Sequence, residues 1–235
     1  MKPLRDWDDL PDFMRTKEVR PYYDILKKHE KELYLKRAFD VVAALILIVL
    51  LAPIMLVVAI LIKLDSPGPV FFRQTRITQY GKEFRIYKFR TMVKNAESIG
   101  TQVTTSNDVR ITKIGSFIRK YRVDEFPQLF NVLNGDMSFV GTRPETIKYV
   151  NKYSPEYYAT MLLPAGITSE TSIRYKSEDT LLLGSDDIDK VYTERILKDK
   201  MLINLDSLIH FSLWNEILTL FRTVIAVLGK DYYYK

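Results

Sequence analysis

The chain of 235 residues contains no cysteine and only two histidines. The lack of cysteine excludes disulfides, thiolate metal sites and cysteine nucleophiles, and it fits a reducing compartment. The histidines, His29 and His210, lie far apart in the sequence, which excludes a histidine-rich zinc site. Walker A, Rossmann, kinase and nucleophile-elbow motifs are also absent, so the common nucleotide-binding and hydrolase patterns do not apply.

Apolar and basic residues are abundant by contrast. Hydrophobic residues make up 47% of the chain and charged residues 27%, which is enough for a sizeable core and excludes global disorder. Lysine and arginine outnumber the acidic residues by 35 to 29, a net charge of +6. This excess suits an anionic partner such as a phosphate compound, a nucleic acid or a lipid headgroup.

Residues 41–62 form an apolar run without a single charge or hydroxyl group. As a straight helix the run would measure about 33 Å, against a hydrocarbon core of roughly 30 Å. A secretory signal peptide is excluded, because the run begins too late and is too long. The sequence therefore predicts a membrane-embedded helix.

The topology of this helix has two solutions. Pro53 removes a backbone donor and crowds the carbonyl of Val49, so the helix is expected to bend there. It either spans the bilayer with a kink or returns to the side from which it entered. Both flanks are rich in lysine and arginine, which is typical of cytoplasmic flanks. Charge alone leaves both arrangements open.

The predicted fold class is mainly α with a small β-hairpin (α+β), in three parts. Residues 1–40 form a charged extension, with surface helices around 22–34 or partial disorder. Residues 41–62 form the membrane helix, and residues 63–235 form the folded body. In the body, aromatic and β-branched residues predict a hairpin with its turn near Tyr80-Gly81. Helices are predicted over 91–99, over 114–121, from an Asp124 N-cap to the stop at Asn134-Gly135, and over 207–228.

The helix predicted over 207–228 is amphipathic, because polar residues recur along it at intervals of three and four. Its apolar side can pack into an ordinary core or lie in the membrane interface. The sequence leaves both open.

Asp124 and Glu125 form an acidic pair that follows the basic residues Arg119, Lys120 and Arg122. An aspartate at this place is most often a simple helix cap. Beside so many cations, however, a carboxylate stays ionised and can act as a nucleophile or hold a hard cation such as Mg²⁺.

Two further basic sites suit phosphate binding. Arg143 lies in a loop next to Pro144, which restricts the backbone, and a stiffly held arginine suits a two-pronged phosphate contact. Standing alone, Arg143 would more often be part of a surface salt bridge. Lys88 and Arg90 alternate with aromatic residues, so they either bind a nucleotide or belong to a half-buried strand. Taken together, these residues indicate phosphate chemistry at a membrane surface.

Five motifs in fixed order resemble the bacterial sugar transferases, the small monotopic phosphoglycosyl transferases. The resemblance covers about 36–230. The motifs are KRAFD (36–40), SPGPVFFRQ (66–74), YKFRTM (87–92), DEFPQL (124–129) and GDMSFVGTRPE (135–145).

The resemblance implies transfer of sugar-1-phosphate from a nucleotide diphosphate sugar to a polyprenyl phosphate, the first membrane step of glycan assembly. It implies Asp124 as the nucleophile and Mg²⁺ ligand, and a role for Glu125 in proton transfer or metal positioning. Arg119 and Arg143 match family arginines, Arg143 as a phosphate ligand. The family's membrane helix is re-entrant, which implies an enzyme on the cytoplasmic face of the bacterial inner membrane. The sugar, the base and the oligomeric state stay open.

Three departures from the family pattern stand out. Ala52 replaces the common serine before Pro53, so no hydroxyl caps the broken helix there. Thr142 replaces the usual proline before Arg143. Residues 164–175 differ from the Gly-Trp-Ala-Gln-type sequence of many members, so a choice of sugar cannot be carried over.

Two rival functions remain from the residues themselves. One is a membrane-anchored basic module that binds nucleic acid or anionic lipid through residues 71–90. It does not explain the acidic pair or the Arg143 loop, so we expect no nucleic-acid partner. The other rival is a membrane-spanning enzyme with different phosphate chemistry.

Overall fold

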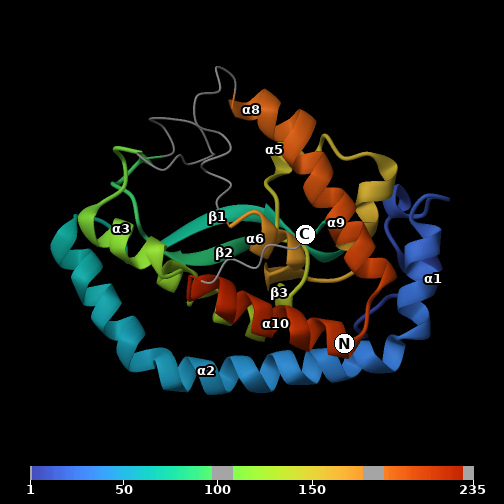
Figure 1. Cartoon of the computed structure of the whole chain (residues 1–235), viewed down its shortest axis with the longest axis horizontal. Coiled ribbons are helices and arrows are strands. Elements are labelled where there is room, and N and C mark those ends of the chain that lie inside the picture. The colour runs from blue at the N-terminus through green and yellow to red at the C-terminus, as the bar shows by residue number, and fades with distance from the viewer. Residues whose placement is uncertain (1, 97–107, 177–187, 230–235) are drawn as a thin grey trace.

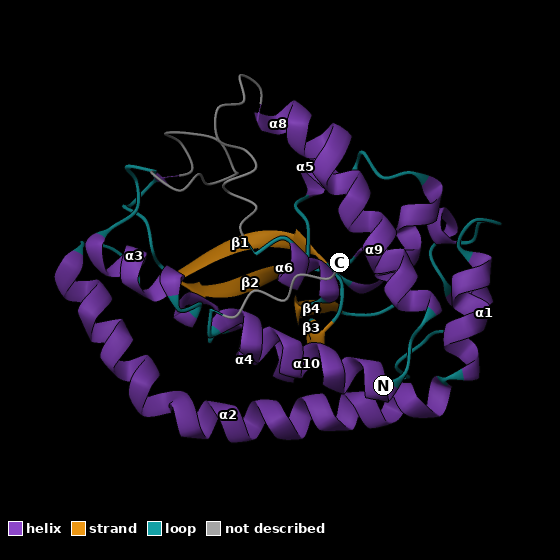
Figure 2. Cartoon of the chain, viewed as in Figure 1, coloured by secondary structure: helices purple, strands orange, loops and turns teal. Residues whose placement is uncertain are grey.

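The computed structural model of the chain describes residues 2–96, 108–176 and 188–229. Within these residues the chain is mainly helical with two small two-stranded sheets (Figure 2), which confirms the predicted class. The α-helices are α1 (Arg20–Lys28), α2 (Glu30–Asp65), α3 (Lys113–Lys120), α4 (Gln128–Asn134), α5 (Ile147–Val150), α6 (Glu170–Arg174), α8 (Ile188–Val191), α9 (Leu197–Ile209) and α10 (Leu213–Val227). The strands are β1 (Phe71–Ile77), β2 (Glu83–Phe89), β3 (Met137–Val140) and β4 (Ala165–Thr168).

The predicted hairpin is confirmed, and a second sheet accompanies it. Strands β1 and β2 pair antiparallel from Phe71↔Phe89 to Ile77↔Glu83. Their turn places Tyr80 and Gly81 at φ of 60° and 75°. Strands β3 and β4 form a short parallel pair that the sequence did not suggest. The helix predicted over 91–99 does not form in residues 91–95, where Met92 bridges Ile111, and 97–99 lie outside the described residues.

The N-terminal extension is a folded part of the body. Its residues form two 3-10 turns, Trp7–Asp9 and Asp12–Met14, followed by α1. Apolar side chains from this segment share one core with the 3-10 helix Pro155–Met161 and with α9. These N-terminal core residues are Leu4, Leu10, Met14, Val19, Tyr22, Tyr23 and Leu26. Partial disorder is therefore excluded for residues 2–29.

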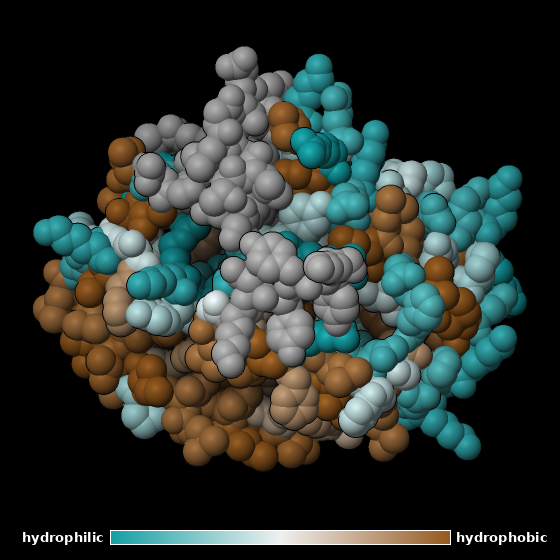
Figure 3. All heavy atoms as spheres, viewed as in Figure 1, coloured by the Kyte–Doolittle hydropathy of each residue, from teal (hydrophilic) through white to brown (hydrophobic). Residues whose placement is uncertain are grey.

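Helix α2 is one continuous helix of 36 residues with Pro53 inside it. It lies along one side of the body and changes direction partway along its length (Figure 1). A proline is the usual cause of such a bend. Helix α2 is long and apolar enough to cross a membrane, and only 11% of its most apolar stretch is buried. Figure 3 shows the resulting continuous hydrophobic surface along this side of the molecule.

The helix predicted over 207–228 is confirmed as α10, which begins at Leu213, whereas residues 207–209 belong to the end of α9. The chain breaks at His210–Ser212, where the Ser212 side chain caps α10 by accepting from the Asn215 N–H. Helix α10 turns its polar side toward the body, with Thr219 buried and Thr223 hydrogen-bonded to Thr168. Its apolar side chains face outward, and Trp214 and Phe221 are each 66% exposed. Ordinary core packing of the apolar side is therefore wrong.

Both ends of α2 are attached to the same body. Near its N-terminal end, Arg37 donates to the carbonyls of Val132 and Leu133 at the end of α4, and Asp40 accepts from the Phe139 N–H. At its C-terminal end, Asp65 accepts from the Ile114 N–H at 3.1 Å. Arg90 donates to the Ser66 carbonyl at 2.6 Å and the Pro67 carbonyl at 3.1 Å. The apolar stretch of α2 is thus attached to the folded body at both of its ends.

Candidate active site

The acidic pair lies in a tight turn between α3 and α4. Arg122 adopts a left-handed conformation, φ 57°, and starts a 3-10 helix over Val123–Glu125. The predicted Asp124 N-cap is wrong, because α4 begins at Gln128 with Pro127 in the cap position and has no side-chain cap. The N–H groups of Glu125 and Phe126 already donate to the carbonyls three residues earlier. The Asp124 side chain is therefore not used for capping.

Glu125 is the centre of the charged cluster. Its Oε1 accepts from Arg143 Nη2 at 2.7 Å and from Lys88 Nζ at 3.0 Å, and it lies 3.8 Å from Arg122 Nη1. Glu125 is only 9% exposed. The site thus holds a buried carboxylate among three cations that come from β2, from the turn before the pair and from the loop after β3.

Burial and charge act on this cluster in opposite directions. Burial by itself would raise the pKa of Glu125, but Arg143, Lys88 and Arg122 outweigh it and hold that pKa well below its ordinary value. The pKa of Arg143 is raised, chiefly by the charge of Glu125. Burial lowers the pKa of Lys88, although Glu125 opposes the effect. Glu125 is therefore ionised and engaged at neutral pH.

Asp124 differs from its neighbour. It is equally buried, at 9% exposed, but its Oδ1 has no hydrogen-bond partner among the described residues. Burial raises the pKa of Asp124 and the charge of Glu125 adds to this, while Lys88, Arg119 and Arg122 pull the pKa down. The pair therefore combines one engaged carboxylate with one whose oxygen is available to a ligand.

The supporting elements fix these side chains relative to one another. Asn131 on α4 accepts from the Tyr87 N–H at 2.9 Å and donates to the Arg85 carbonyl at 3.0 Å. These two bonds attach α4 to the edge of β2 that does not pair with β1. Strand β2 also carries Lys88. The loop that carries Arg143 begins at Gly141, whose N–H donates to the Thr168 carbonyl, and a Cβ at Gly141 would collide with the Pro164 carbonyl.

Most of the predicted site residues come together. Asp124, Glu125, Lys88 and Arg143 form the cluster. Arg119, at the end of α3, lowers the pKa of Asp124. Pro144, next to Arg143 in the chain, is buried. Arg90 lies elsewhere, buried at the C-terminal end of α2, where it donates to the Ser66 and Pro67 carbonyls.

Sequence reasoning left several supporting residues out. Arg122 was noted only as a neighbour of the pair, yet it lies within ion-pair distance of Glu125. Arg76 donates to the Pro144 carbonyl at 3.1 Å, and its partial burial lowers its pKa. Asn131 lies two residues after the end of the 124–129 motif and carries no sequence signal of its own, because its role depends on a strand far away in sequence.

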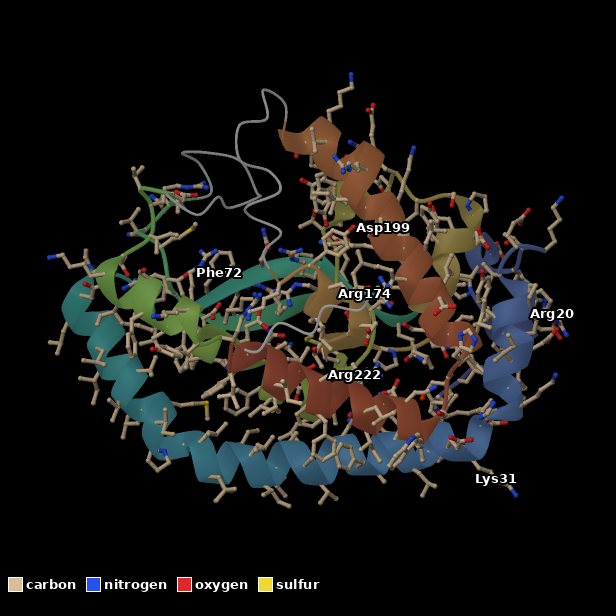
Figure 4. All side chains as sticks on the ribbon, in the orientation of Figure 1. Arg20, Lys31, Phe72, Arg174, Asp199 and Arg222 are labelled. Atoms are coloured by element: carbon tan, nitrogen blue, oxygen red, sulfur yellow. The ribbon has the colours of Figure 1, made fainter. Side chains whose placement is uncertain are left out.

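A second charged group lies apart from this cluster, between α6 and α10. Arg174 and Arg222 both approach Glu170 at 3.5 Å, and both are labelled in Figure 4. They line a cavity of about 290 Å³ between α6, α9 and α10, and the acidic pair is not among its lining residues. These arginines therefore serve as natural controls for Arg143.

The chain is similar to known proteins over most of its length. A family model described as bacterial sugar transferase matches residues 31–230. A protein of Aeromonas hydrophila named UDP-N-acetylgalactosamine-undecaprenyl-phosphate N-acetylgalactosaminephosphotransferase is 39% identical over 202 residues. That match covers 83% of this chain and 44% of the relative, so the chain spans less than half of that relative's length.

Two shorter relatives match over more of their own length. UDP-glucose:undecaprenyl-phosphate glucose-1-phosphate transferase of Caulobacter vibrioides is 38% identical, with 83% of this chain and 70% of the relative covered. A protein of Bacillus subtilis named putative undecaprenyl-phosphate N-acetylgalactosaminyl 1-phosphate transferase is 41% identical, with 66% of this chain and 86% of the relative covered. The named sugars differ among relatives of similar identity.

Proposed function

Since the chain belongs to the bacterial sugar transferase family, we propose that it transfers sugar-1-phosphate from a nucleotide diphosphate sugar to a polyprenyl phosphate. The observation that carries the proposal is the pairing of an available buried carboxylate, Asp124, with a neighbouring carboxylate held by three cations. This arrangement suits a reaction in which a carboxylate attacks a phosphate.

The proposed reaction proceeds in two displacements at one phosphorus atom. An Asp124 carboxylate oxygen attacks the phosphorus that carries the sugar, and the bond from this phosphorus to the bridging oxygen breaks. The nucleoside monophosphate leaves with the bridging oxygen and its electron pair. An oxygen of the polyprenyl phosphate then attacks the same phosphorus, which releases the Asp124 carboxylate and forms a polyprenyl diphosphate sugar.

Cations must offset the repulsion between the anions that meet in both steps. Arg143 and Lys88 carry that charge within hydrogen-bond distance of Glu125. When a diphosphate enters, their remaining donors are available to its oxygens. Glu125 keeps both cations in place, and Arg119 adds positive potential at Asp124. We assign substrate binding to Lys88, Arg119, Arg143 and the Arg143-Pro144 turn.

Mg²⁺ fits this site through Asp124. Its Oδ1 is buried without a protein partner among the described residues, as expected of an oxygen that takes an external ligand. No group of three or more acidic or histidine side chains that could hold a metal occurs in the described residues. That agrees with the usual preference of Mg²⁺ for one or two carboxylates together with substrate phosphates and water. Bound there, the ion would supply charge neutralisation at the diphosphate.

The proposed location is the cytoplasmic face of the bacterial inner membrane, with α2 re-entrant. The attachment of both ends of α2 to one body supports this, because a helix that crossed the bilayer would separate its ends by roughly 30 Å of hydrocarbon. The outward apolar side of α10 suits the interface. A membrane location brings the site to a lipid substrate that stays in the bilayer.

The rival basic binding module is less well supported. Several cations of residues 71–90 are engaged within the protein: Arg73 stacks 3.8 Å from the Tyr87 ring centre, Lys88 binds Glu125, and Arg90 binds backbone carbonyls. We therefore expect no nucleic-acid partner.

The deciding experiment measures release of nucleoside monophosphate by the purified protein in detergent, with polyprenyl phosphate, Mg²⁺ and a panel of nucleotide sugars. We expect turnover with at least one sugar, and none for Asp124→Asn although that variant stays folded. Without the lipid acceptor, mass spectrometry should find a phosphosugar adduct on Asp124 of the wild type. Normal turnover by Asp124→Asn would refute the assignment of the nucleophile.

A further inference from the structure

A π-helical turn, Tyr192–Ile196, joins α8 to α9. Such turns are rare and are frequently found at functional sites. The turn directs Tyr192 and Ile196 into a core cluster with Tyr149, Leu197 and Met201. The Tyr192 ring lies 4.6 Å from that of Tyr149, centre to centre. Tyr192 is thereby held on the inner side of the helix.

The Tyr192 hydroxyl completes a buried chain of polar groups. It donates to Glu145 Oε1 at 2.6 Å, and Lys200 Nζ approaches the same hydroxyl at 3.4 Å. All three residues are buried. Because a lysine ammonium can only donate, the Tyr192 hydroxyl accepts a hydrogen bond from Lys200 and donates its own hydrogen to the Glu145 carboxylate. This order of donors fixes the orientation of Glu145.

Glu145 lies two residues after Arg143, at the end of the same loop. Its backbone carbonyl accepts from the Ile77 N–H at 3.0 Å, and its charge is one of those that act on Arg143. At the start of the loop, Gly141 is held against β4. The loop is therefore fixed on both sides of Arg143. Beyond Arg143, Arg76 donates to the Pro144 carbonyl and Tyr192 binds the Glu145 side chain.

We propose that Tyr192, acting through Glu145, is a positioning residue that holds the 141–145 loop so that Arg143 faces Glu125 and the substrate phosphate. The proposal rests on the function proposed above. It extends the active site to a helix that no site motif includes. Loss of the hydroxyl leaves Glu145 oriented by fewer donors, and Arg143 then samples positions away from the phosphate.

The test compares Tyr192→Phe with Tyr149→Phe. Tyr149 belongs to the same aromatic cluster, but its hydroxyl donates to Asp189 at 2.7 Å. We expect Tyr192→Phe to lower kcat/KM about tenfold, the usual cost of about one hydrogen bond. Tyr149→Phe should change it less than twofold. Equal losses in the two variants, or wild-type kinetics in Tyr192→Phe, would overturn the proposal.

A double-mutant cycle separates positioning from general destabilisation. In an Arg143→Ala background, Tyr192→Phe should have no further effect on kcat/KM, whereas a merely structural defect would multiply with the loss of Arg143. Amide hydrogen exchange of residues 141–146 gives a readout that does not need turnover. Exchange should accelerate in Tyr192→Phe and not in Tyr149→Phe. Unchanged exchange of residues 141–146 in Tyr192→Phe would refute the positioning role. Absence of turnover by the wild type with every nucleotide sugar would instead refute the proposed function, and the exchange measurement would still test the positioning role.

Discussion

At the scale of single residues, the two carboxylates of the pair have opposite environments. In the described part of the chain, one oxygen of Asp124 has no hydrogen-bond partner, whereas Glu125 binds two cations at hydrogen-bond distance. This difference divides the work of the site, with Asp124 available for reaction and Glu125 for positioning. Pairs of titratable groups whose pKa values move apart are a common feature of active sites.

The same difference predicts how each carboxylate affects stability. The folded-state pKa of Asp124 is raised by burial, so its ionised form destabilises the protein once the pH exceeds that pKa. The pKa of Glu125 is depressed, so its contribution is present above the unfolded value of about 4.3 and is lost as the pH falls through the folded value.

Asp124→Asn should therefore raise Tm at pH 7, and Glu125→Gln should lower it. The Asp124→Asn difference should shrink on acidification toward about pH 4, where the unfolded aspartate becomes protonated. The Glu125→Gln difference should largely persist at about pH 4, because the folded-state pKa of Glu125 lies well below its unfolded value. Thermal unfolding of the wild type and both variants in one detergent, across pH 4 to 8, is the measurement. Shifts of the same sign at pH 7 would contradict the opposite environments of the pair.

Arg143 offers a second test at this scale. Arg143→Lys keeps the charge but loses the planar two-pronged contact. Loss of one charge-assisted contact costs about 1.5–3 kcal/mol, or about 10- to 150-fold in kcat/KM. Arg174→Lys is the matched control, since Arg174 is half-exposed and pairs with Glu170 outside the cluster. Equal activity of Arg143→Lys and the wild type would make Arg143 an ordinary salt-bridge residue.

At the scale of elements, the sequence predicts those helices and strands whose position depends on a local pattern of residues. The hairpin follows from alternating aromatic and β-branched residues, and the end of α4 follows from Gly135, which adopts φ 83°. The cap at Asp124 was mispredicted because a left-handed Arg122 starts a 3-10 turn before it. The division between α9 and α10 was missed because the break, His210–Ser212, contains neither proline nor glycine to mark it.

The candidate site likewise contains residues that the sequence predicts and residues that only the structure reveals. Lys88, Asp124, Glu125 and Arg143 belong to motifs that can be read from the sequence. Asn131 and Tyr192 act across 44 and 47 residues of sequence respectively, through Tyr87 and Glu145. Contacts of this kind depend on how elements pack, and no pattern within a single element encodes them.

Arg90 was expected to bind the substrate, but in the structure it binds backbone carbonyls of the protein. Its guanidinium donates to carbonyls at the C-terminal end of α2, which a lysine cannot reproduce because it lacks the forked geometry. We expect Arg90→Lys to lower the free energy of unfolding by about 1.5–3 kcal/mol, while KM for the nucleotide sugar stays within about twofold. Thermal unfolding and steady-state kinetics on one preparation are the measurements. A raised KM at unchanged stability would favour direct substrate binding by Arg90.

At the scale of the whole molecule, the helix that carries the hydrophobic surface packs directly against the elements of the candidate site. Helix α2 packs on α4 through Ala44, Leu129 and Val132, directly beside the turn that carries the acidic pair. Near its other end, Val58 and Ile62 pack on Phe89 and Ile118. The helix that we propose to lie in the membrane therefore contacts the strand and helices that hold the candidate site residues.

The last prediction concerns the membrane topology of α2. We expect residues 41–62 to enter and leave on the cytoplasmic side, with a bend near Pro53. Pro53 divides the run into pieces of 12 and 9 residues, about 18 Å and 14 Å long, each too short to cross the bilayer core. Ala52 offers no hydroxyl to the Val49 carbonyl, so backbone groups or buried water must satisfy it.

Single cysteines at Lys31 and Lys63 provide the test, because the chain has no cysteine and both positions are exposed. Lys31 points away from the body, as Figure 4 shows. In intact cells an impermeant thiol reagent should label neither position, and permeabilised cells should show labelling of both. Labelling of one position alone in intact cells would establish a single crossing. Pro53→Ala should straighten α2 and shift part of the population toward that crossing, because the restored hydrogen bond removes the cause of the bend.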